Sequence, residues 1–161
     1  MYPEWLSKNI KPGMKNINFF SDCIEIAGLK VLRENLKAPA NGTDVWEEGG
    51  DSYFTFQAAR RESANRGLRA PSDEQWQILE DAMPGESNGE RFGNLLRLLG
   101  LPLAGYCNGG SCDRRGVRAY YWSSPESGGS AWYRSFNYAN ATVYRGTYTQ
   151  SYAFSVRCLK D

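Results

Sequence analysis

The C-terminal part of the chain carries the side chains best suited to molecular recognition. Seven of the ten tyrosines lie from Tyr120 onward, and residues 132–152 are dominated by Tyr, Ser, Asn, Thr, Gly and Arg. Tyr offers a large, stiff contact surface at a low cost in rotamer entropy, and Ser, Gly and Asn adapt their hydrogen bonds to a partner. Tyr and Thr also favour strands, so a purely structural, tyrosine-rich antiparallel sheet is the alternative interpretation.

Histidine is absent from the sequence. Its absence excludes the Ser-His-Asp and Cys-His systems of nucleophilic catalysis and every zinc or iron site that has a histidine ligand. It also removes the commonest general base. We expect that the chain is not an enzyme and that it needs neither a cofactor nor a metal, and the missing histidine removes the commonest routes to catalysis and metal binding.

The four cysteines are Cys23, Cys107, Cys112 and Cys158, and they allow three disulfide pairings. Cys107 and Cys112 flank a Gly-rich loop whose ends can meet, so a local disulfide is one expectation. A four-thiolate zinc site is the alternative, but the sequence contains only one closely spaced pair instead of two. Cys23 and Cys158 lie in apolar, strand-like runs, which is typical of free buried thiols.

The totals favour one domain with no general affinity for nucleic acid or membranes. A chain of 161 residues can bury a substantial core. Its net charge of +1 produces no global attraction to nucleic acid or to a membrane surface. No apolar run approaches the roughly 18 residues of a membrane span, and no signal peptide is visible at the N-terminus. We expect an unidentified macromolecular target, a protein. The compartment and the oligomeric state stay open, and the sequence is compatible with a cytoplasmic or a particle-associated setting.

Three helices are predicted before the tyrosine-rich region. Thr55 can cap a helix that Gly67 ends. The run Ser72-Asp73-Glu74-Gln75 is a capping box with acidic residues at the positive end of the helix. The apolar face that follows consists of Trp76, Leu79, Ala82 and Met83. A third apolar helical pattern begins at Asn88 or Gly89 and ends at Gly100.

Strands are predicted on both sides of these helices. Residues 23–33 alternate about a small-residue turn, which indicates a β-hairpin. Residues 37–52 contain Pro39 and the pairs Asn41-Gly42 and Gly49-Gly50, and they are interpreted as a loop. From Leu103 onward, glycines separate short strands. Helices followed by strands predict an α+β domain with segregated layers.

Several motifs occur in the order found in one family. Residues 26–36 resemble the opening hairpin of the bacterial major paralogous domain, a family with the C-type lectin fold. Residues 67–76 resemble its second-helix signature, which formylglycine-generating enzymes share. Residues 101–106 and 120–124 resemble its core strands, and residues 154–158 its last strand. The resemblance implies a C-type lectin fold of the formylglycine-generating-enzyme-like type over residues 23–161, with two to three helices packed on antiparallel sheets and residues 1–22 as a lead-in.

Variable proteins of diversity-generating retroelements are similar to this fold and carry their diversity near the C-terminus. Erroneous copying of template adenines turns Asn codons into codons for Tyr, Ser, Thr, Asp, Gly and Arg. Residues 118–152 resemble such a hypervariable region, interleaved with fixed Trp132, Phe136, Val143 and Phe154. The resemblance implies a ligand-binding protein whose site is rewritten on a constant scaffold.

The sequence lacks two functional motifs of related proteins, which bears on the alternative functions. The Glu-Pro-Asn, Gln-Pro-Asp and Trp-Asn-Asp motifs of calcium-dependent lectins are absent. The residues that flank Cys107 and Cys112 do not match the reactive cysteine site of formylglycine-generating enzymes. A fixed lectin-like or adhesion module of the same fold is the second interpretation, and an oxidase of the formylglycine-generating type is the third.

Strand alternation selects the candidate binding residues. Trp132, Arg134 and Phe136 are expected to face the core, while Tyr133 and its alternate neighbours face away from it. The predicted binding residues, all expected to be exposed on one face, are Tyr133, Ser135, Asn137, Tyr138, Asn140, Tyr144, Arg145 and Tyr148. Arg134 is expected either to lie at the sheet edge or to pair with an acid such as Glu126.

Overall fold

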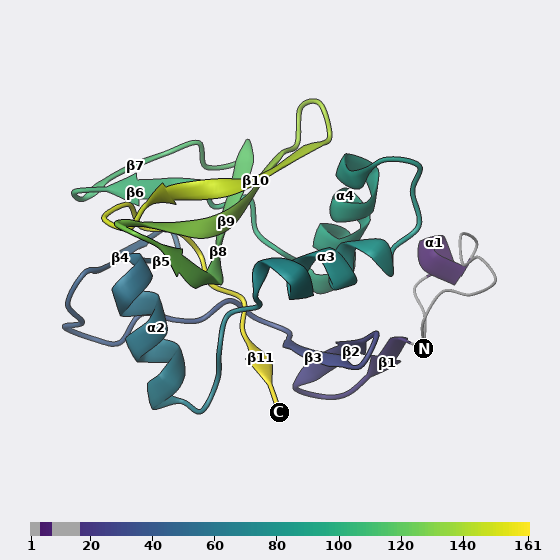
Figure 1. The fold of residues 1–161 in the computed structure, drawn as a ribbon, viewed down its shortest axis with the longest axis horizontal. Helices are drawn as coiled ribbons and strands as arrows, with labels where there is room; N and C mark the ends of the chain where they lie inside the picture. The colour runs from purple at the N-terminus through teal and green to yellow at the C-terminus, as the bar shows by residue number, and fades with distance from the viewer. Residues whose placement is uncertain (1–3, 8–16) are drawn as a thin grey trace.

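Helices and antiparallel strands form separate layers in the computed structural model, which describes residues 4–7 and 17–161 (Figure 1). The described helices are α1 (Glu4–Ser7), α2 (Phe56–Asn65), α3 (Asp73–Asp81) and α4 (Asn88–Leu99). The described strands are β1 (Ile17–Phe19), β2 (Cys23–Ile26), β3 (Leu29–Leu32), β4 (Val45–Glu48), β5 (Asp51–Phe54), β6 (Tyr106–Asn108), β7 (Ser111–Asp113), β8 (Arg118–Ser127), β9 (Ser130–Asn137), β10 (Thr142–Thr149) and β11 (Leu159–Lys160). The predicted α+β class is confirmed.

A four-stranded sheet in the order β1-β2-β3-β11 joins the two ends of the described chain. The predicted hairpin is formed by β2 and β3, and it turns at Ala27 and Gly28, both at positive φ. From the lead-in, β1 also pairs with β2. The last paired strand is Leu159–Lys160, which replaces the predicted strand at residues 154–158. Of those residues, Phe154 and Ser155 form isolated bridges with Phe54 and Tyr121 instead.

The segment interpreted as a loop, residues 37–52, contains part of a second hairpin. In it, β4 and β5 pair antiparallel from Val45↔Phe54 to Glu48↔Asp51. Gly49 and Gly50 form the two-residue turn at φ values of 59° and 87°. Left-handed values at both positions suit the turns that join hairpin strands. The turn expected at Gly49-Gly50 is confirmed, but the assignment of residues 45–48 and 51–52 to a loop is wrong, because they form the paired strands on either side of that turn.

All three predicted helices are present, and their ends follow the predicted caps. Thr55 caps α2. The N–H of Gln75 donates to Ser72 Oγ at 3.0 Å, and the Gln75 side chain accepts from the Ser72 N–H at 2.9 Å, which completes the capping box. Gly100 ends α4 in the left-handed conformation. The apolar face of α3 is buried, with Trp76 fully enclosed.

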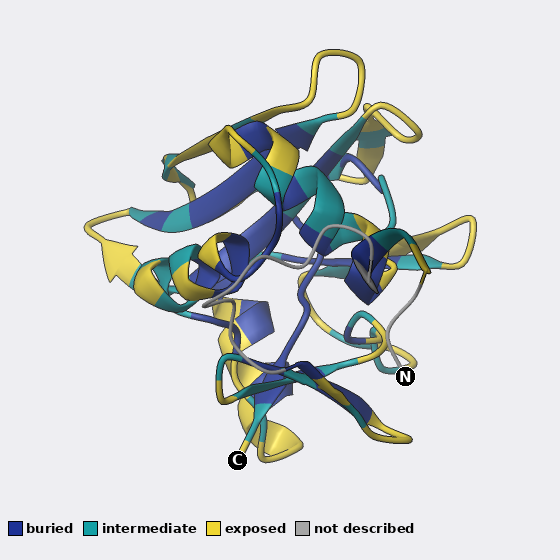
Figure 2. Cartoon of the chain, turned by 90° about the vertical axis from the view of Figure 1, so that its right-hand side faces the viewer, coloured by how far each residue is buried: buried dark blue, intermediate teal, exposed yellow. Residues whose placement is uncertain are grey.

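The three-stranded sheet β10-β9-β8 has packing on both faces (Figure 2). One face packs against α3 and α4, where Phe136 lies 5.5 Å from Phe92 between ring centroids. On the other side of the sheet, Trp122 packs against Phe154 at 4.2 Å and against Phe56 of α2 at 5.5 Å. Each cluster joins residues from distant parts of the sequence, so the sheet separates two portions of the core.

The four cysteines form one local disulfide and two buried free thiols. Cys107 and Cys112 form a disulfide across the β6–β7 hairpin, which removes two of the four thiolates that a zinc site would need. Cys23 and Cys158 are buried free thiols, as predicted, and burial raises the pKa of Cys158 to about 11. Within residues 4–7 and 17–161, no three His, Cys, Asp or Glu side chains gather as a metal site.

None of the helices in the described ranges has the length and apolar character required to cross a membrane.

Candidate functional site: a tyrosine-lined pocket

The register of the three-stranded sheet assigns its side chains to two faces. Directly paired residues of neighbouring antiparallel strands lie on the same face. Ser135 pairs with Tyr120 on one side and with Tyr144 on the other, and Tyr133 pairs with Trp122. We call the side of the sheet that carries these five residues the tyrosine face.

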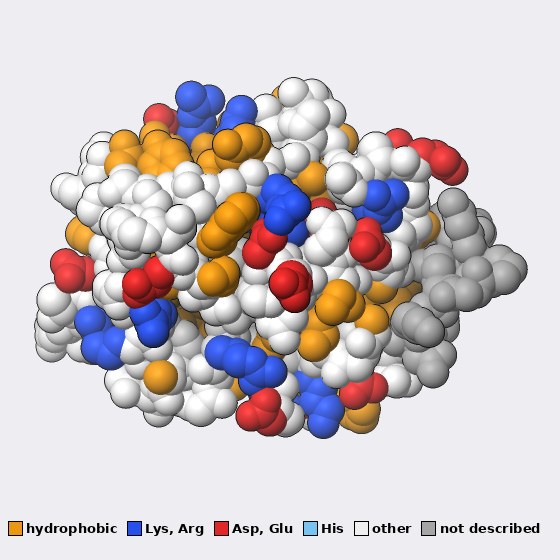
Figure 3. All heavy atoms as spheres, viewed as in Figure 1, with side chains coloured by type: hydrophobic (Ala, Val, Ile, Leu, Met, Phe, Trp, Pro, Cys, Tyr) orange, Lys and Arg blue, Asp and Glu red, His pale blue; other side chains and the backbone are white. Residues whose placement is uncertain are grey.

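A pocket of about 210 Å³ opens on the tyrosine face. Its lining residues, six of them tyrosines, are Tyr106, Arg114, Arg118, Tyr120, Tyr133, Ser135, Tyr144, Tyr148, Tyr152 and Phe154. We call it the tyrosine pocket. Figure 3 shows side chains of the hydrophobic class, which includes Tyr, gathered near basic ones over β6, β7 and β10.

Tyr133 holds the aromatic wall of the tyrosine pocket together. Its ring centroid lies 5.3 Å from that of Phe154 and 5.6 Å from that of Tyr148. It also stacks nearly parallel to Tyr120 at 6.3 Å. These separations fall in the range in which aromatic pairs attract one another beyond simple burial. Tyr133 is therefore a structural part of the pocket.

Residues distant in sequence complete the pocket. Cys107 of β6 exchanges two backbone hydrogen bonds with Ala153, at 3.0 and 2.8 Å. A parallel bridge between Tyr121 and Ser155 holds the residues that follow Ala153 beside β8. Tyr106 and Tyr152 are brought together by this pairing and stack at 5.6 Å. Because β6 is also closed by the disulfide, the covalent hairpin fixes one wall of the pocket.

Two polar atoms of the pocket are buried without a hydrogen-bond partner among the described residues. They are Ser135 Oγ and Arg118 Nε. Ser135 is only 3% exposed. Alternation along β8 places Arg118 on the same face as Tyr120, and hence as Ser135. Most buried polar groups in proteins have a partner, so these two atoms mark a place where a bound group can supply one.

Three phenol groups of the pocket, those of Tyr133, Tyr106 and Tyr148, have raised pKa values and favour their protonated form. Burial, followed by the nearby Tyr144, Tyr120 and Tyr148, raises the pKa of Tyr133 to about 12. Burial also raises the pKa values of Tyr106 and Tyr148. A protonated phenol can both donate and accept a hydrogen bond. The walls of the pocket therefore offer neutral hydrogen-bond donors near pH 7.

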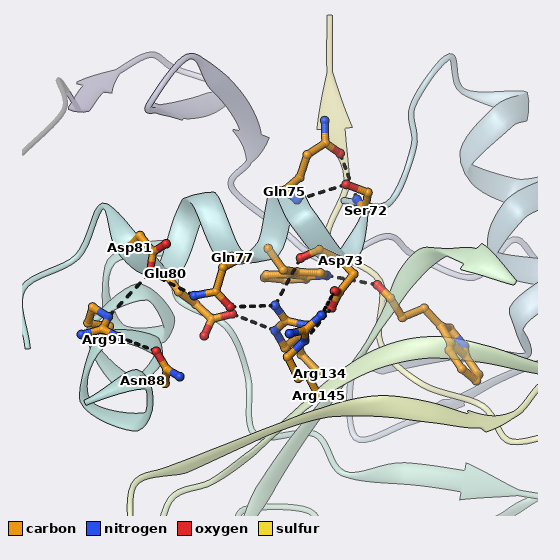
Figure 4. Close-up of polar contacts among 12 residues, drawn as sticks. Ser72, Asp73, Gln75, Gln77, Glu80, Asp81, Asn88, Arg91, Arg134 and Arg145 are labelled. Atoms are coloured by element: carbon orange, nitrogen blue, oxygen red, sulfur yellow. Dashed lines mark hydrogen bonds and ion pairs between the residues drawn. The ribbon is translucent and has the colours of Figure 1, made fainter. Parts of the chain in front are cut away.

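A buried arginine fixes the opposite face of the sheet to α3. Arg134 Nε donates to Glu80 Oε2 at 2.7 Å, and its other nitrogens contact Asp73 and Gln77. Asp73, Gln77 and Glu80 occur at positions i, i+4 and i+7 and so share one side of the helix. Figure 4 shows Arg134 and Arg145 converging on Asp73 from the strands below α3.

Of the two alternatives predicted for Arg134, pairing with an acid is confirmed, although the partner is not Glu126, and the position at the sheet edge is wrong. Arg134 lies in the central strand β9, not at the edge of the sheet. Its acidic partners are Asp73 and Glu80, whereas Glu126 pairs with Arg60 of α2. Alternation assigned Arg134 to the core side correctly, but a strand pattern carries no information about which helix covers that side.

Arg145 lies on the same face as Arg134, which contradicts its predicted place beside the tyrosines. The register pairs the two arginines directly. Arg145 forms an ion pair with Asp73, and its guanidinium lies 5.6 Å from the Trp132 ring centroid. Asp73 thus lies between two like charges on neighbouring strands that would otherwise repel each other. Trp132 is only half-buried here, not a core residue as expected.

The two carboxyl groups on α3 have opposite pKa shifts. Burial opposes the ionisation of Asp73, but the hydrogen bonds and charges of Arg145 and Arg134 outweigh it and hold the Asp73 pKa below its ordinary 3.8. At Glu80 burial dominates and raises the pKa above its ordinary 4.5, although Arg134 limits the rise. Asp73 is therefore the firmer anionic anchor for both strands.

The eight predicted binding residues do not form one exposed surface. Four line the tyrosine pocket (Tyr133, Ser135, Tyr144 and Tyr148), three lie at the end of the β9–β10 hairpin (Asn137, Tyr138 and Asn140), and Arg145 faces α3. The expected exposure holds for Tyr138, at 68%, and for Tyr144, at 59%. It is wrong for Tyr133, at 6%, and for Ser135, because neighbouring aromatic rings cover them.

The β9–β10 hairpin projects past the sheet and is exposed at its end (Figures 1 and 2). The hydroxyl of Thr142 donates to Asn140 Oδ1 at 2.7 Å within the turn. The first turn of α4 supports the hairpin closely, since a Cβ on Gly89 would lie 1.8 Å from Ala141 O. Tyr138 is therefore presented to solvent by a turn that rests on a helix.

The predicted set lacks six of the pocket residues, namely Tyr106, Arg114, Arg118, Tyr120, Tyr152 and Phe154. Period-two alternation along β8 could have identified Arg118 and Tyr120, since both lie on the face opposite to buried Tyr121. No local pattern could have identified Tyr106 and Tyr152, because their contact depends on long-range backbone pairing.

The pocket combines aromatic surfaces, neutral hydroxyl groups and two arginines, an arrangement suited to noncovalent recognition. The buried, unpartnered Ser135 and Arg118 atoms indicate where a bound group would receive directional hydrogen bonds. No protein-family model, curated protein or solved structure matches the chain.

Proposed function

We propose that this chain is a target-recognition protein that binds another macromolecule, a protein, through the tyrosine pocket and the adjoining hairpin. The observation that carries the proposal is the unequal use of the two sheet faces. One face is fixed to α3 by buried Arg134, while the other opens into a tyrosine-lined pocket. Aromatic and arginine side chains are the usual energetic anchors of protein interfaces.

The proposal includes a C-type lectin scaffold and diversification by a retroelement. In support of the scaffold, β11 at the C-terminus pairs with the N-terminal hairpin strand β3 in one antiparallel sheet. In support of diversification, Tyr138, Asn140 and Tyr144 are exposed at the hairpin and the pocket, whereas Phe136 and Phe154 are buried. Such a division permits the surface to change while the core is kept.

A display library tests the recognition role. The library randomises Tyr138, Asn140, Tyr144 and Tyr148 among Tyr, Ser, Asn and Asp, and it is selected against a panel of unrelated proteins. A control library of equal size randomises exposed residues of α2, namely Arg60, Arg61, Ala64 and Asn65. We expect binders mainly from the first library. Equal yields from the two libraries would contradict a dedicated recognition face.

The DNA beside the gene tests diversification separately. We expect a near-copy of the segment that encodes residues 118–152, differing only at adenines of the copy and lying close to a reverse transcriptase gene. A flanking sequence without such a repeat, in an otherwise intact locus, would remove the retroelement from the proposal and leave the binding face.

A fixed adhesion or lectin-like module is a second candidate, favoured by the burial of Tyr133 and Ser135. A site rewritten at these two positions would have to tolerate changes in a packed aromatic wall, whereas a fixed site would not. Deep mutational scanning with a folding readout separates the candidates. If substitutions are broadly tolerated at Tyr138 and Tyr144 but not at Tyr133 and Ser135, the result favours a fixed pocket with a variable rim. If substitutions are tolerated at all four of these positions, the result favours full diversification.

A further inference from the structure

We infer that the tyrosine pocket receives the carboxylate of an acidic side chain, Asp or Glu, from the protein target. This inference rests on the proposed function and adds the chemical class of the group that the pocket anchors. The observation behind it is that two residues lining the pocket, Ser135 and Arg118, each carry a buried polar atom without a hydrogen-bond partner among the described residues, Oγ and Nε respectively.

The available hydrogen-bonding groups favour an acceptor. The Nε–H of Arg118 can only donate, and the Ser135 hydroxyl can also donate. The phenols of Tyr133, whose pKa is raised to about 12, and of Tyr106 and Tyr148, whose pKa values are also raised, stay protonated and add further donors. A carboxylate supplies several acceptor positions, and guanidinium–carboxylate hydrogen bonds are among the stronger ones in proteins.

The charges of the lining residues also favour a carboxylate. Two arginines, Arg114 and Arg118, contribute to its lining, and the described lining residues include no Asp or Glu. Asp113, whose charge contributes to the raised pKa of Tyr106, lies outside the lining and accepts the backbone N–H of Arg114 at 2.7 Å. The guanidinium of Arg118 has no ion-pair partner among the described residues, so an entering carboxylate would be its first counter-charge.

The size of the pocket selects one anchor residue over a free small molecule. Its volume of about 210 Å³ is below the roughly 300–1,000 Å³ of pockets that enclose drug-sized ligands. Protein interfaces commonly concentrate their binding energy in a few residues that enter small, well-packed pockets. Tyr144 at the mouth, 59% exposed, can cover the stem of such a residue.

An NMR titration with blocked amino acids tests the inference on the intact protein. The probes are N-acetyl-aspartate N-methylamide and the corresponding asparagine derivative, which differ in charge but hardly in shape. We expect the aspartate probe to shift the Arg118 Nε–H resonance and the Tyr133 ring signals with saturation, while the asparagine probe does not. Inorganic phosphate at matched ionic strength forms a third arm. Equal shifts from both amino acids, no shifts, or tighter binding of phosphate would overturn the assignment.

Matched variants identify the residues responsible. Arg118→Lys keeps the charge but removes the Nε–H, and we expect the aspartate probe to bind about tenfold more weakly or worse. Arg69→Lys, at an exposed arginine paired with Asp161, is the control and should bind like the parent protein. Equal affinities of the Arg118→Lys variant and the parent would contradict the inference.

Ser135→Ala adds a readout that does not depend on Arg118. Replacing an unpartnered buried hydroxyl by a methyl should leave the melting temperature unchanged or raise it, because no hydrogen bond is lost. Probe affinity should nevertheless fall. A loss of stability would show that the hydroxyl has a structural partner and would overturn its role as a ligand donor. If the display library yields no binders but the aspartate probe binds as expected, the proposed function alone is refuted. If the library yields binders but the aspartate probe does not bind, only the carboxylate assignment is refuted.

Discussion

At the scale of single residues, the start of α3 shows how much stability depends on two side chains of different kinds. Ser72 caps the helix, and Trp76 is fully buried one turn later. Replacing Ser72 with Ala should cost about 1 kcal/mol, because one hydrogen bond to the helix terminus is lost. Trp76→Ala should cost about 3–5 kcal/mol, because a large cavity remains. Urea denaturation measures both, and equal small losses would contradict the packing of α3.

Asp73 predicts a specific dependence of stability on pH. Its folded pKa lies below its ordinary 3.8 because of Arg145 and Arg134, despite burial. A lowered folded pKa contributes stability that is complete above the unfolded pKa and is lost as pH falls through the folded pKa. Asp73→Asn should therefore be less stable than the parent near pH 7, and this difference should shrink as the pH falls below about 4.

Thermal melts of both proteins from pH 7 to pH 2 check this expectation. Glu80, whose pKa burial raises, titrates in both proteins and contributes the opposite slope, so only the difference between parent and variant is informative. A difference that stays constant with pH would show that Asp73 acts through its shape or its hydrogen bonds and not through its charge.

At the scale of elements, buried Arg134 joins β9 to α3. Arg134→Met leaves Glu80 buried without its counter-charge and should cost about 3–5 kcal/mol. Adding Glu80→Met should recover most of that loss, since an apolar pair of similar volume needs no compensation for lost hydration. Asp73 keeps Arg145 as its partner in both variants. Chemical denaturation of the two variants decides, and a double variant as unstable as the single one would contradict the ion-pair account.

Two glycines of α4 form a matched pair for testing how the helix supports the hairpin. A Cβ at Gly89 would meet Ala141 O at 1.8 Å, whereas one at Gly93 would meet the Phe136 ring at an ordinary 3.4 Å. Gly89→Ala should therefore destabilise the protein by about 1–3 kcal/mol through overpacking. Gly93→Ala should stabilise it by up to about 1 kcal/mol, since Ala favours a helix. Thermal melts compare them, and equal effects would show that the hairpin does not rest on α4.

At the scale of the whole molecule, tolerance to substitution should follow exposure and not residue type. Exchanging Tyr138, Asn140 and Tyr144 among Tyr, Ser, Asn and Asp should change stability by no more than about 0.5 kcal/mol per site. Adding Tyr133→Ser should cost on the order of 3 kcal/mol, because a packed ring is removed from the pocket wall. Phe136→Ala, on the other face, is the control for a core loss. Equal tolerance at Tyr133 would contradict the structural role assigned to its ring.

The sequence alone determined those features that depend on residues close together in the chain. The capping box at Ser72, the hairpin of residues 23–33 and the Cys107–Cys112 disulfide each form between neighbours, so local residue types suffice to predict them. The alternation of β9 likewise placed Arg134 and Phe136 on the core side correctly.

Only the tertiary structure decided which of the tyrosines are exposed and where a ligand can bind. Tyr133 is buried because Phe154, brought beside β8 by long-range backbone pairing, packs against its ring. On the opposite face, where alternation with Tyr144 places it, Arg145 pairs with Asp73, which lies 72 positions earlier in the chain. Alternation within one strand gives two faces but does not reveal what covers each of them. That depends on packing between distant segments, so the tyrosine pocket emerges only in the folded chain.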